Sequence, residues 1–117
     1  MIFYAKDKIA GIREKVWNGQ GEVHGLNCFT ADGRPGKTCF QMLAENTLPV
    51  GASIGVHTHT DNEEVYIITK GRGIYTDNDG QEYPVLPGDT TLTRRGEKHG
   101  LAQSGDEPMT FLAIIAG

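Results

Sequence analysis

The chain has 117 residues, of which 38% are hydrophobic and 22% are charged, and its formal net charge is −4. This composition is ordinary for a globular domain, lacks the basic excess of nucleic-acid-binding proteins and contains no apolar run of about 18 residues that could span a membrane. Residues 1–8 lack the basic and apolar blocks of a signal peptide, so we expect a cytoplasmic protein that binds neither nucleic acid nor membranes. Cys28 and Cys39 fit no zinc or redox motif, and we expect them to be reduced, buried thiols.

The first part of the chain gives an ambiguous signal. In residues 7–17, the apolar positions 9, 12 and 16 have helical spacing, but Gly11 disfavours a helix. An extended conformation through residues 12–16 is the alternative, and we favour extended edge strands here. We expect residues 18–21 to be a flexible connection and residues 23–29 to be a strand.

Short strands separated by turns dominate the rest of the chain. The pair Asp79-Gly80 is a strong hairpin signal, and glycines and prolines mark the other turns. Many short strands with turns about every 8 to 12 residues are typical of a β-sandwich or β-barrel, so we expect one all-β domain spanning residues 1–117. The predicted strands are residues 38–44, 53–59, 64–70, 73–76, 81–85, 90–93, 99–103 and 109–115.

Three of the four histidines fall into one pattern with a carboxylate. Side chains alternate between the two faces of a strand, so His57 and His59 point the same way, about 7 Å apart. Two imidazoles and a carboxylate that face one point can bind a divalent metal ion, and His99, from a distant segment, would complete the site. Spacing alone leaves open whether Glu63 or Glu64 is the ligand, because the two side chains point in opposite directions.

Residues 51–71 resemble the first sequence motif of the cupin family. That motif reads Gly, five residues, His-x-His, three or four residues, Glu, six residues and Gly. The residues that fit it without a gap are Gly51, His57, His59, Glu64 and Gly71.

The second cupin motif, from Gly88 to Gln103, is matched less completely. It reads Gly, five residues, Pro-x-Gly, two residues, His, three residues and Asn. Gly88, Gly96 and His99 occupy their places, whereas Arg94 stands where proline is usual and Gln103 where asparagine is usual. The two motifs together identify the chain as similar to small single-domain cupins.

The resemblance implies both a fold and a metal site. The fold is a double-stranded β-helix, or jelly-roll, barrel, in which residues 1–47 supply N-terminal strands and residues 48–117 carry both motifs. The six residues between Glu64 and Gly71 favour Glu64 over Glu63 as the ligand. The residues implied to bind one metal ion inside the barrel are His57, His59, Glu64 and His99.

Two further residues are candidate catalytic residues. Tyr66 shares a strand face with Glu64 and could act as an acid, although a core tyrosine with a satisfied hydroxyl is the alternative. Gln103 shares a face with His99, so we expect it near the metal, where its amide could contact a substrate or sit at the barrel mouth.

The remaining functional side chains give weaker signals. Lys70, which shares the face of Tyr66, is a candidate inward-facing basic group. We expect Arg94 and Arg95 to lie on a solvated turn rather than to clamp an anion. We expect His24 to be structural or exposed, and Trp17 to serve packing or an interface rather than a pocket wall.

Three imidazoles and one carboxylate suit a divalent transition metal, which can be Mn, Fe, Co, Ni, Cu or Zn. An octahedral ion with four protein ligands keeps two open positions, so one hypothesis is a metalloenzyme acting on a small organic substrate. A dioxygenase is the least contradicted activity, and a decarboxylase, isomerase or lyase is an alternative. The competing hypothesis is a protein that binds a small molecule or metal without turnover.

The N-terminal segment carries more apolar side chains than a loop needs. Those side chains could cover one sheet or pack against a second copy of the chain, and homodimers are common among small cupins. We therefore expect a homodimer. The apolar residues concerned are Ile2, Phe3, Tyr4, Ile9, Ile12, Val16 and Trp17.

Overall fold

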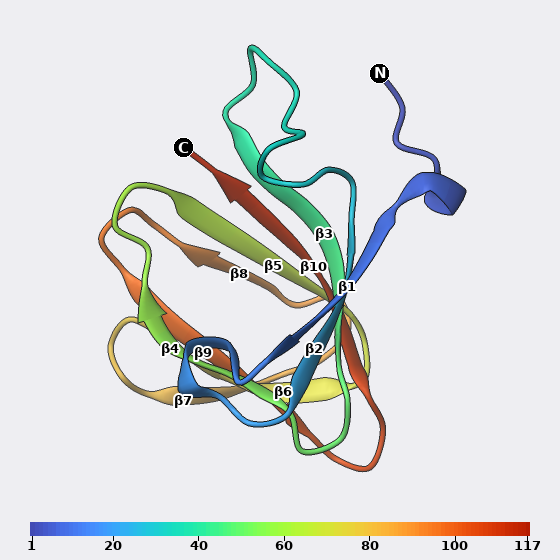
Figure 1. Ribbon diagram of the computed structural model, residues 1–117. Coiled ribbons are helices and arrows are strands. Elements are labelled where there is room, and N and C mark those ends of the chain that lie inside the picture. The colour runs from blue at the N-terminus through green and yellow to red at the C-terminus, as the bar shows by residue number, and fades with distance from the viewer.

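A computed structural model describes all residues of the chain, 1–117. Ten β-strands and two short 3-10 helices build two facing sheets in which every strand pair is antiparallel (Figure 1). The six-stranded sheet has the order β1-β2-β3-β10-β5-β8, and the four-stranded sheet has the order β4-β9-β6-β7. The elements are η1 (Ala5–Asp7), β1 (Ile9–Glu14), η2 (Val16–Asn18), β2 (Glu22–Asn27), β3 (Phe40–Leu48), β4 (Ser53–Thr58), β5 (Glu63–Lys70), β6 (Arg72–Thr76), β7 (Glu82–Val85), β8 (Thr90–Thr93), β9 (Lys98–Ser104) and β10 (Met109–Ala116).

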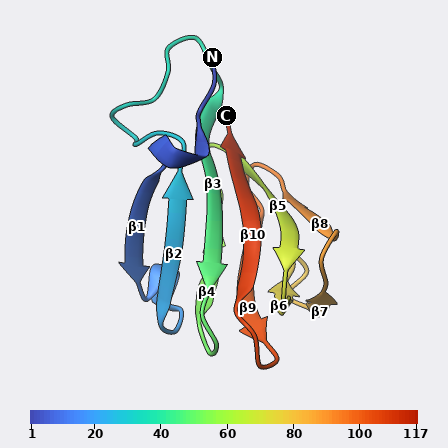
Figure 2. The ribbon, with the colours of Figure 1, turned by 90° about the vertical axis from the view of Figure 1, so that its right-hand side faces the viewer.

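The connections cross repeatedly from one sheet to the other. The last strand, β10, lies between β3 and β5, so strands far apart in the sequence become neighbours (Figure 2). This is the connectivity of a jelly roll, and the predicted all-β, double-stranded β-helix is confirmed. Each of the eight strands predicted after residue 37 corresponds to one of β3 to β10, with ends that differ by a few residues.

The N-terminal strands extend the six-stranded sheet at one edge (Figure 2). β1 pairs with β2 along its whole length, so the extended interpretation of this region is correct and the helical one is wrong. Residues 18–21, expected to be a flexible connection, are instead tied to β4. Gln20 donates its backbone N–H to the Ser53 hydroxyl, and Ser53 donates its own to the Gln20 carbonyl. Neither 3-10 helix is long or apolar enough to cross a membrane.

The inner faces of the two sheets pack into one hydrophobic core. Its most deeply buried apolar side chains include Leu48, Ile68, Leu101, Met109 and Phe111. A smaller set of polar and ionisable side chains is buried beside them, which is costly unless each finds a partner. This set consists of Asn46, His57, His59, Glu64, Thr93 and His99.

Candidate metal centre

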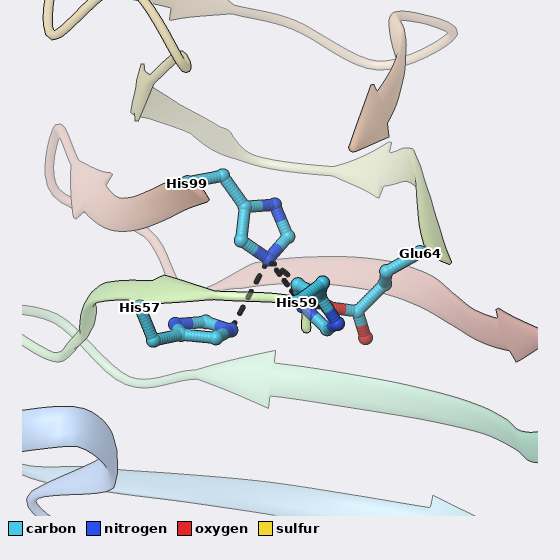
Figure 3. A group of neighbouring side chains, drawn as sticks. All are labelled: His57, His59, Glu64 and His99. Atoms are coloured by element: carbon cyan, nitrogen blue, oxygen red, sulfur yellow. Dashed lines mark hydrogen bonds and ion pairs between the residues drawn. The ribbon is translucent and has the colours of Figure 1, made fainter. Parts of the chain in front are cut away.

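The four residues of the predicted metal site converge between the two sheets (Figure 3). His57 lies in β4, His59 directly follows that strand, and His99 lies in β9 of the same sheet, whereas Glu64 comes from β5 of the opposite sheet. His57 and His99 are paired directly across β4 and β9, so their side chains share a face. All four side chains are buried. Glu63, the alternative ligand, is exposed.

A β-bulge in β4 aims His57 into the site. Ile54 pairs with Leu101 and His57 pairs with His99, so β4 has one more residue than β9 between these two pairs. Strict alternation would put Ile54 and His57 on opposite faces, but the extra residue leaves both side chains buried on the inner face.

The distances between the ligand atoms fit one metal ion. His59 Nε2 lies 3.0 Å from Glu64 Oε1 and 3.1 Å from His99 Nε2. His99 Nε2 lies 3.1 Å from Glu64 Oε1 and 3.2 Å from His57 Nε2. Neighbouring ligands at about 2.1 Å from an octahedral ion are about 3 Å apart, so the three Nε2 atoms and one carboxylate oxygen could surround a single transition metal ion.

The second ring nitrogen of two histidines donates a hydrogen bond that leaves Nε2 free as a ligand. His57 Nδ1 donates to the Gly55 carbonyl at 2.8 Å. His59 Nδ1 donates to Asn62 Oδ1 at 2.6 Å, and Asn62 is itself held because its Nδ2 donates to Gln41 Oε1 at 3.0 Å. A neutral imidazole that donates from Nδ1 presents its Nε2 lone pair, which is the form that binds metal.

The His99 ring is fixed by two hydroxyls and an aromatic ring. Thr93 Oγ1 and the Tyr75 hydroxyl lie 2.7 Å and 3.2 Å from His99 Nδ1, and 2.8 Å from each other. The Tyr66 ring stacks on His99 with ring centroids 4.8 Å apart and an interplanar angle of 19°. Thr93 in β8 is paired with Glu64 in β5, so the threonine that contacts the His99 ring also lies beside the carboxylate ligand.

The electrostatics of the cluster favour a charged Glu64. Burial opposes ionisation of its carboxyl group, but hydrogen bonds from His59 and His99 outweigh that cost and hold the pKa of Glu64 below its usual value. The bond to Glu64 raises the pKa of His59, whereas burial lowers the pKa of His57. In the metal-free protein the ring of His59 therefore holds a proton more readily than the ring of His57, and a divalent cation would take the place of that proton.

A cavity of about 340 Å³ opens onto the cluster, and His57, His59 and Glu64 line it. Trp17, in η2, also lines this cavity, and its indole stacks on His57 with centroids 4.9 Å apart and an interplanar angle of 7°. Trp17 therefore packs on His57, as one of the expected roles requires, but it also lines the cavity, so the expectation that it is not a pocket wall is wrong.

The close packing of η2 on β4 explains the position of Trp17. A Cβ atom on Gly55 would collide with the Trp17 carbonyl oxygen, so only glycine permits this approach. Lys15, Trp17 and Asn18 have φ angles of 48°, 52° and 63°, a left-handed conformation that is uncommon for residues with side chains. Such a conformation persists where the surrounding structure enforces it, and here it places the indole over the site.

A family model for the cupin domain matches residues 44–115. The chain belongs to the cupin family. The resemblance seen in the two sequence motifs is thereby confirmed, and the four clustered residues occupy the positions at which the cupin motifs place metal ligands.

Individual cupins of known description resemble the chain to different extents. An oxalate-binding protein of Thermotoga maritima is 34% identical over 97 residues, which cover 83% of this chain and 78% of that protein. A gentisate 1,2-dioxygenase of a Ralstonia species is 39% identical over 59 residues, which cover 50% of this chain but only 16% of the enzyme. The crystal structure of a predicted oxalate decarboxylase from T. maritima superposes with a TM-score of 0.88 at 28% identity, covering 99% of this chain and 98% of the other.

The two candidate catalytic residues lie in different parts of the cupin barrel. Tyr66 lines the cavity beside the metal cluster. Gln103 does not line it: its Oε1 accepts the Gly51 N–H at 2.9 Å, and its Nε2 donates to carbonyls in residues 104–107. Gln103 was expected near the metal because it shares a strand face with His99. The two residues are four positions apart along the strand, however, which is a distance of about 13 Å. The structure thus places Gln103 at a junction between loops rather than beside the cluster.

The other functional candidates lie outside the cavity. Lys70 is exposed at the end of β5, so its expected inward position is wrong. Arg94 is exposed and bonds Glu97 through its Nε and Nη2 atoms, and Arg95 is exposed, as a solvated turn requires. His24 is exposed and bonds Glu22 at 2.9 Å, as expected. Both cysteines are free, but Cys28 is half-buried and Cys39 is exposed, so their expected burial is wrong.

Several cavity residues lie outside the cupin motifs or were given no role by the sequence. Arg13 in β1, Asn46 in β3 and Asp61 after β4 all line the cavity. Asn46 carried a usable signal, because it is the one polar residue in the alternating inner-face series 42, 44, 46 and 48. Arg13 and Asp61 carried none, since their positions depend on strand pairing and loop geometry.

Proposed function

We propose that this cupin binds one divalent transition metal ion through His57, His59, Glu64 and His99, and that the metal in turn binds a small carboxylate of the oxalate type. The convergence of three Nε2 atoms and one carboxylate oxygen beside a cavity carries the proposal. The similarity to an oxalate-binding protein over 83% of the chain supports the ligand class. Mn, Fe, Co, Ni, Cu and Zn all suit this set of ligand atoms.

The number of open positions on the metal favours a six-coordinate ion. Four protein ligands leave two positions on an octahedral ion, which is enough for two oxygens of one oxalate. A tetrahedral zinc ion would have no open position unless its coordination expanded. The cavity of about 340 Å³ is at the small end of the range of small-molecule sites, as expected for a ligand of a few carbon atoms.

Tyr66 is proposed as a hydrogen-bond donor to the bound ligand. Burial, together with the nearby charge of Glu64, raises the pKa of Tyr66 well above its usual value. The phenol therefore stays protonated at neutral pH, so it can donate a hydrogen bond but cannot act as a base. Gln103, by contrast, is proposed to hold loops together, because both ends of its amide already bond backbone groups.

A second candidate function is decarboxylation of the bound ligand. Loss of CO₂ from the oxalate monoanion breaks the carbon–carbon bond and requires that a proton reach the remaining carbon, which yields formate. The exposed carboxyl of Asp61 lines the cavity and could carry that proton. Similarity to a predicted oxalate decarboxylase supports this candidate, and the partial similarity to a gentisate dioxygenase keeps oxygen-dependent chemistry as a further test.

The proposed function is tested first by elemental analysis of protein purified without added metal and then by calorimetric titration with oxalate. We expect about one metal ion per chain and binding of oxalate only to the metal-loaded protein. Carbon-13 NMR of labelled oxalate distinguishes retention from conversion to formate and CO₂, and an oxygen electrode reports oxygenase activity. Metal-loaded protein that binds no oxalate would contradict the proposed ligand.

We also propose that the chain forms a homodimer through its N-terminal region. Ile2, Tyr4 and Ile12 expose 70%, 57% and 61% of their surfaces, and β1 is an edge strand with every residue exposed. Such an edge is available to pair with another chain. Light scattering that gives a monomer mass of 12.7 kDa would contradict the dimer.

A further inference from the structure

The side of the cavity formed by the N-terminal strand carries a guanidinium group. Arg13 in β1 is paired with Val23 in β2, and Val23 is 1% exposed within the core. Paired residues in neighbouring antiparallel strands share a face, so Arg13 is on the inner face, where it lines the cavity with Trp17 and Met42. Neither cupin motif includes this strand.

Arg13 has no hydrogen-bond or ion-pair partner in the protein. Arg94, in contrast, bonds the carboxylate of Glu97. The acidic groups that line the cavity with Arg13 are Glu64, which bonds His59 and His99, and the exposed Asp61. An unpaired guanidinium in such a place suits an anionic ligand.

Asn46 provides a second, independent sign of a polar ligand. It lines the same cavity, is 2% exposed, and its Oδ1 atom is buried without a hydrogen-bond partner. Buried amide groups are usually paired. A carboxylate cannot bond Oδ1, because both are acceptors, but the Nδ2 group of the same amide is a donor that makes no hydrogen bond within the protein and could bond such a ligand. Asn46 is opposite Gly25 in the pairing of β2 and β3, and its Oδ1 faces that glycine, since a Cβ atom there would lie 3.0 Å from it.

We propose that Arg13 and Asn46 form a second subsite, which binds the carboxylate oxygens of the ligand that are not bound to the metal. The inference rests on the proposed function, in which the metal binds two oxygens of the ligand and leaves its other carboxylate oxygens free. The planar guanidinium matches a carboxylate, and the Nδ2 group of Asn46 can donate a hydrogen bond beside it. The cavity would therefore select dicarboxylates over monocarboxylates, with the separation between metal and Arg13 deciding the chain length.

The test is calorimetric titration of metal-loaded protein with oxalate, malonate, succinate, formate and acetate. The parent is compared with Arg13→Gln, Arg13→Lys and Asn46→Leu, and Arg95→Gln serves as a control that removes the same charge from an exposed turn. Metal content and thermal unfolding are measured for each variant. These measurements establish whether Arg13→Gln, which changes an exposed edge strand, remains folded and metal-loaded.

We expect Arg13→Gln to weaken binding of the preferred dicarboxylate by about 10-fold to 100-fold, with formate and acetate changed by less than about 2-fold. Arg13→Lys should fall between the parent and Arg13→Gln, because it keeps the charge without the planar fork. Asn46→Leu should weaken the same ligand, and Arg95→Gln should match the parent. Equal dicarboxylate binding by the parent and a folded, metal-loaded Arg13→Gln would overturn the subsite alone, whereas a parent that binds no carboxylate would refute the proposed function as well.

Discussion

The motif strands and the N-terminal segment contribute to the same cavity in opposite ways. In β5 and β9, and in β4 and the residue that follows it, each proposed metal ligand is buried and bonded to its neighbours. In residues 13–17, Arg13 is exposed and unpaired, and Trp17 is 60% exposed. We therefore propose that the motif strands set the metal affinity, whereas the N-terminal segment can change the ligand preference without changing the metal. The predictions that follow test that division.

The largest effect is expected from removing a metal ligand. His57→Ala and Glu64→Ala each delete one of four ligand atoms, so we expect at least about a 100-fold loss of metal affinity. Loss of a residue that only hydrogen-bonds a ligand typically costs 10-fold to 100-fold in affinity, and loss of the ligand itself should cost more. The metal content after dialysis, measured by elemental analysis, should fall from about one ion per chain to well below that. Glu63→Ala is the matched control, because Glu63 is the exposed neighbour of Glu64. Retention of metal by Glu64→Ala would show that the ligand set is wrong.

A smaller loss of metal affinity is expected when a residue that orients a ligand is changed. Asn62 accepts the His59 Nδ1 hydrogen bond, so Asn62→Ala should lower metal affinity by about 10-fold to 100-fold. Asn62→Asp keeps an acceptor and should remain close to the parent. Competition with a chelator of known affinity measures both variants. If the two variants bind metal equally, the hydrogen bond to His59 has no role in orienting the ligand.

The sequence was sufficient to predict the metal site in the motif strands, because the motif residues lie close together in the chain. His57, His59 and Glu64 are separated by fixed spacings within one motif; alternation predicts that the two histidines point the same way, and Glu64 faces them from the opposite sheet. Their correct placement still depended on a bulge in β4 that no residue pattern announced. Gln103 shows the limit of the same argument, since sharing a face with His99 does not bring two residues close along a strand.

The N-terminal half could not be predicted in the same way. Arg13 reaches the cavity through the register between β1 and β2, and Trp17 through a left-handed turn that follows β1. Both depend on contacts between residues about 10 to 40 positions apart, such as that of Trp17 with Gly55. Alternation identifies which residues share a face, but only the packed structure shows which face meets the cavity.

A third prediction tests whether packing of η2 on β4 holds the Trp17 wall in place. Gly55→Ala would force the Trp17 carbonyl away, and we expect the free energy of unfolding to fall by about 1–3 kcal/mol. Gly11→Ala in β1 is the control, because a Cβ atom there meets nothing within 4 Å. Denaturant unfolding of the metal-free proteins, followed by circular dichroism, gives both values. A Gly55→Ala protein as stable as Gly11→Ala would mean that the contact contributes nothing.

The smallest predicted effect is the pH dependence of the metal-free cluster. The bond to Glu64 raises the pKa of His59 above 6.5, so its stabilisation is complete below pH 6.5 and is lost as the pH rises through the raised pKa. The lowered pKa of Glu64 contributes stability that is present above pH 4.5 and lost as the pH falls through the lowered value. His57, whose pKa is lowered by burial, acts in the opposite sense to His59, since its contribution is present above pH 6.5 and lost below.

We therefore expect metal-free protein to lose about 1 kcal/mol or less above pH 6.5 through His59, as measured by denaturant unfolding from pH 4 to 9. Glu64→Gln should remove that loss, and a decline of unchanged size in this variant would assign it to groups outside the cluster.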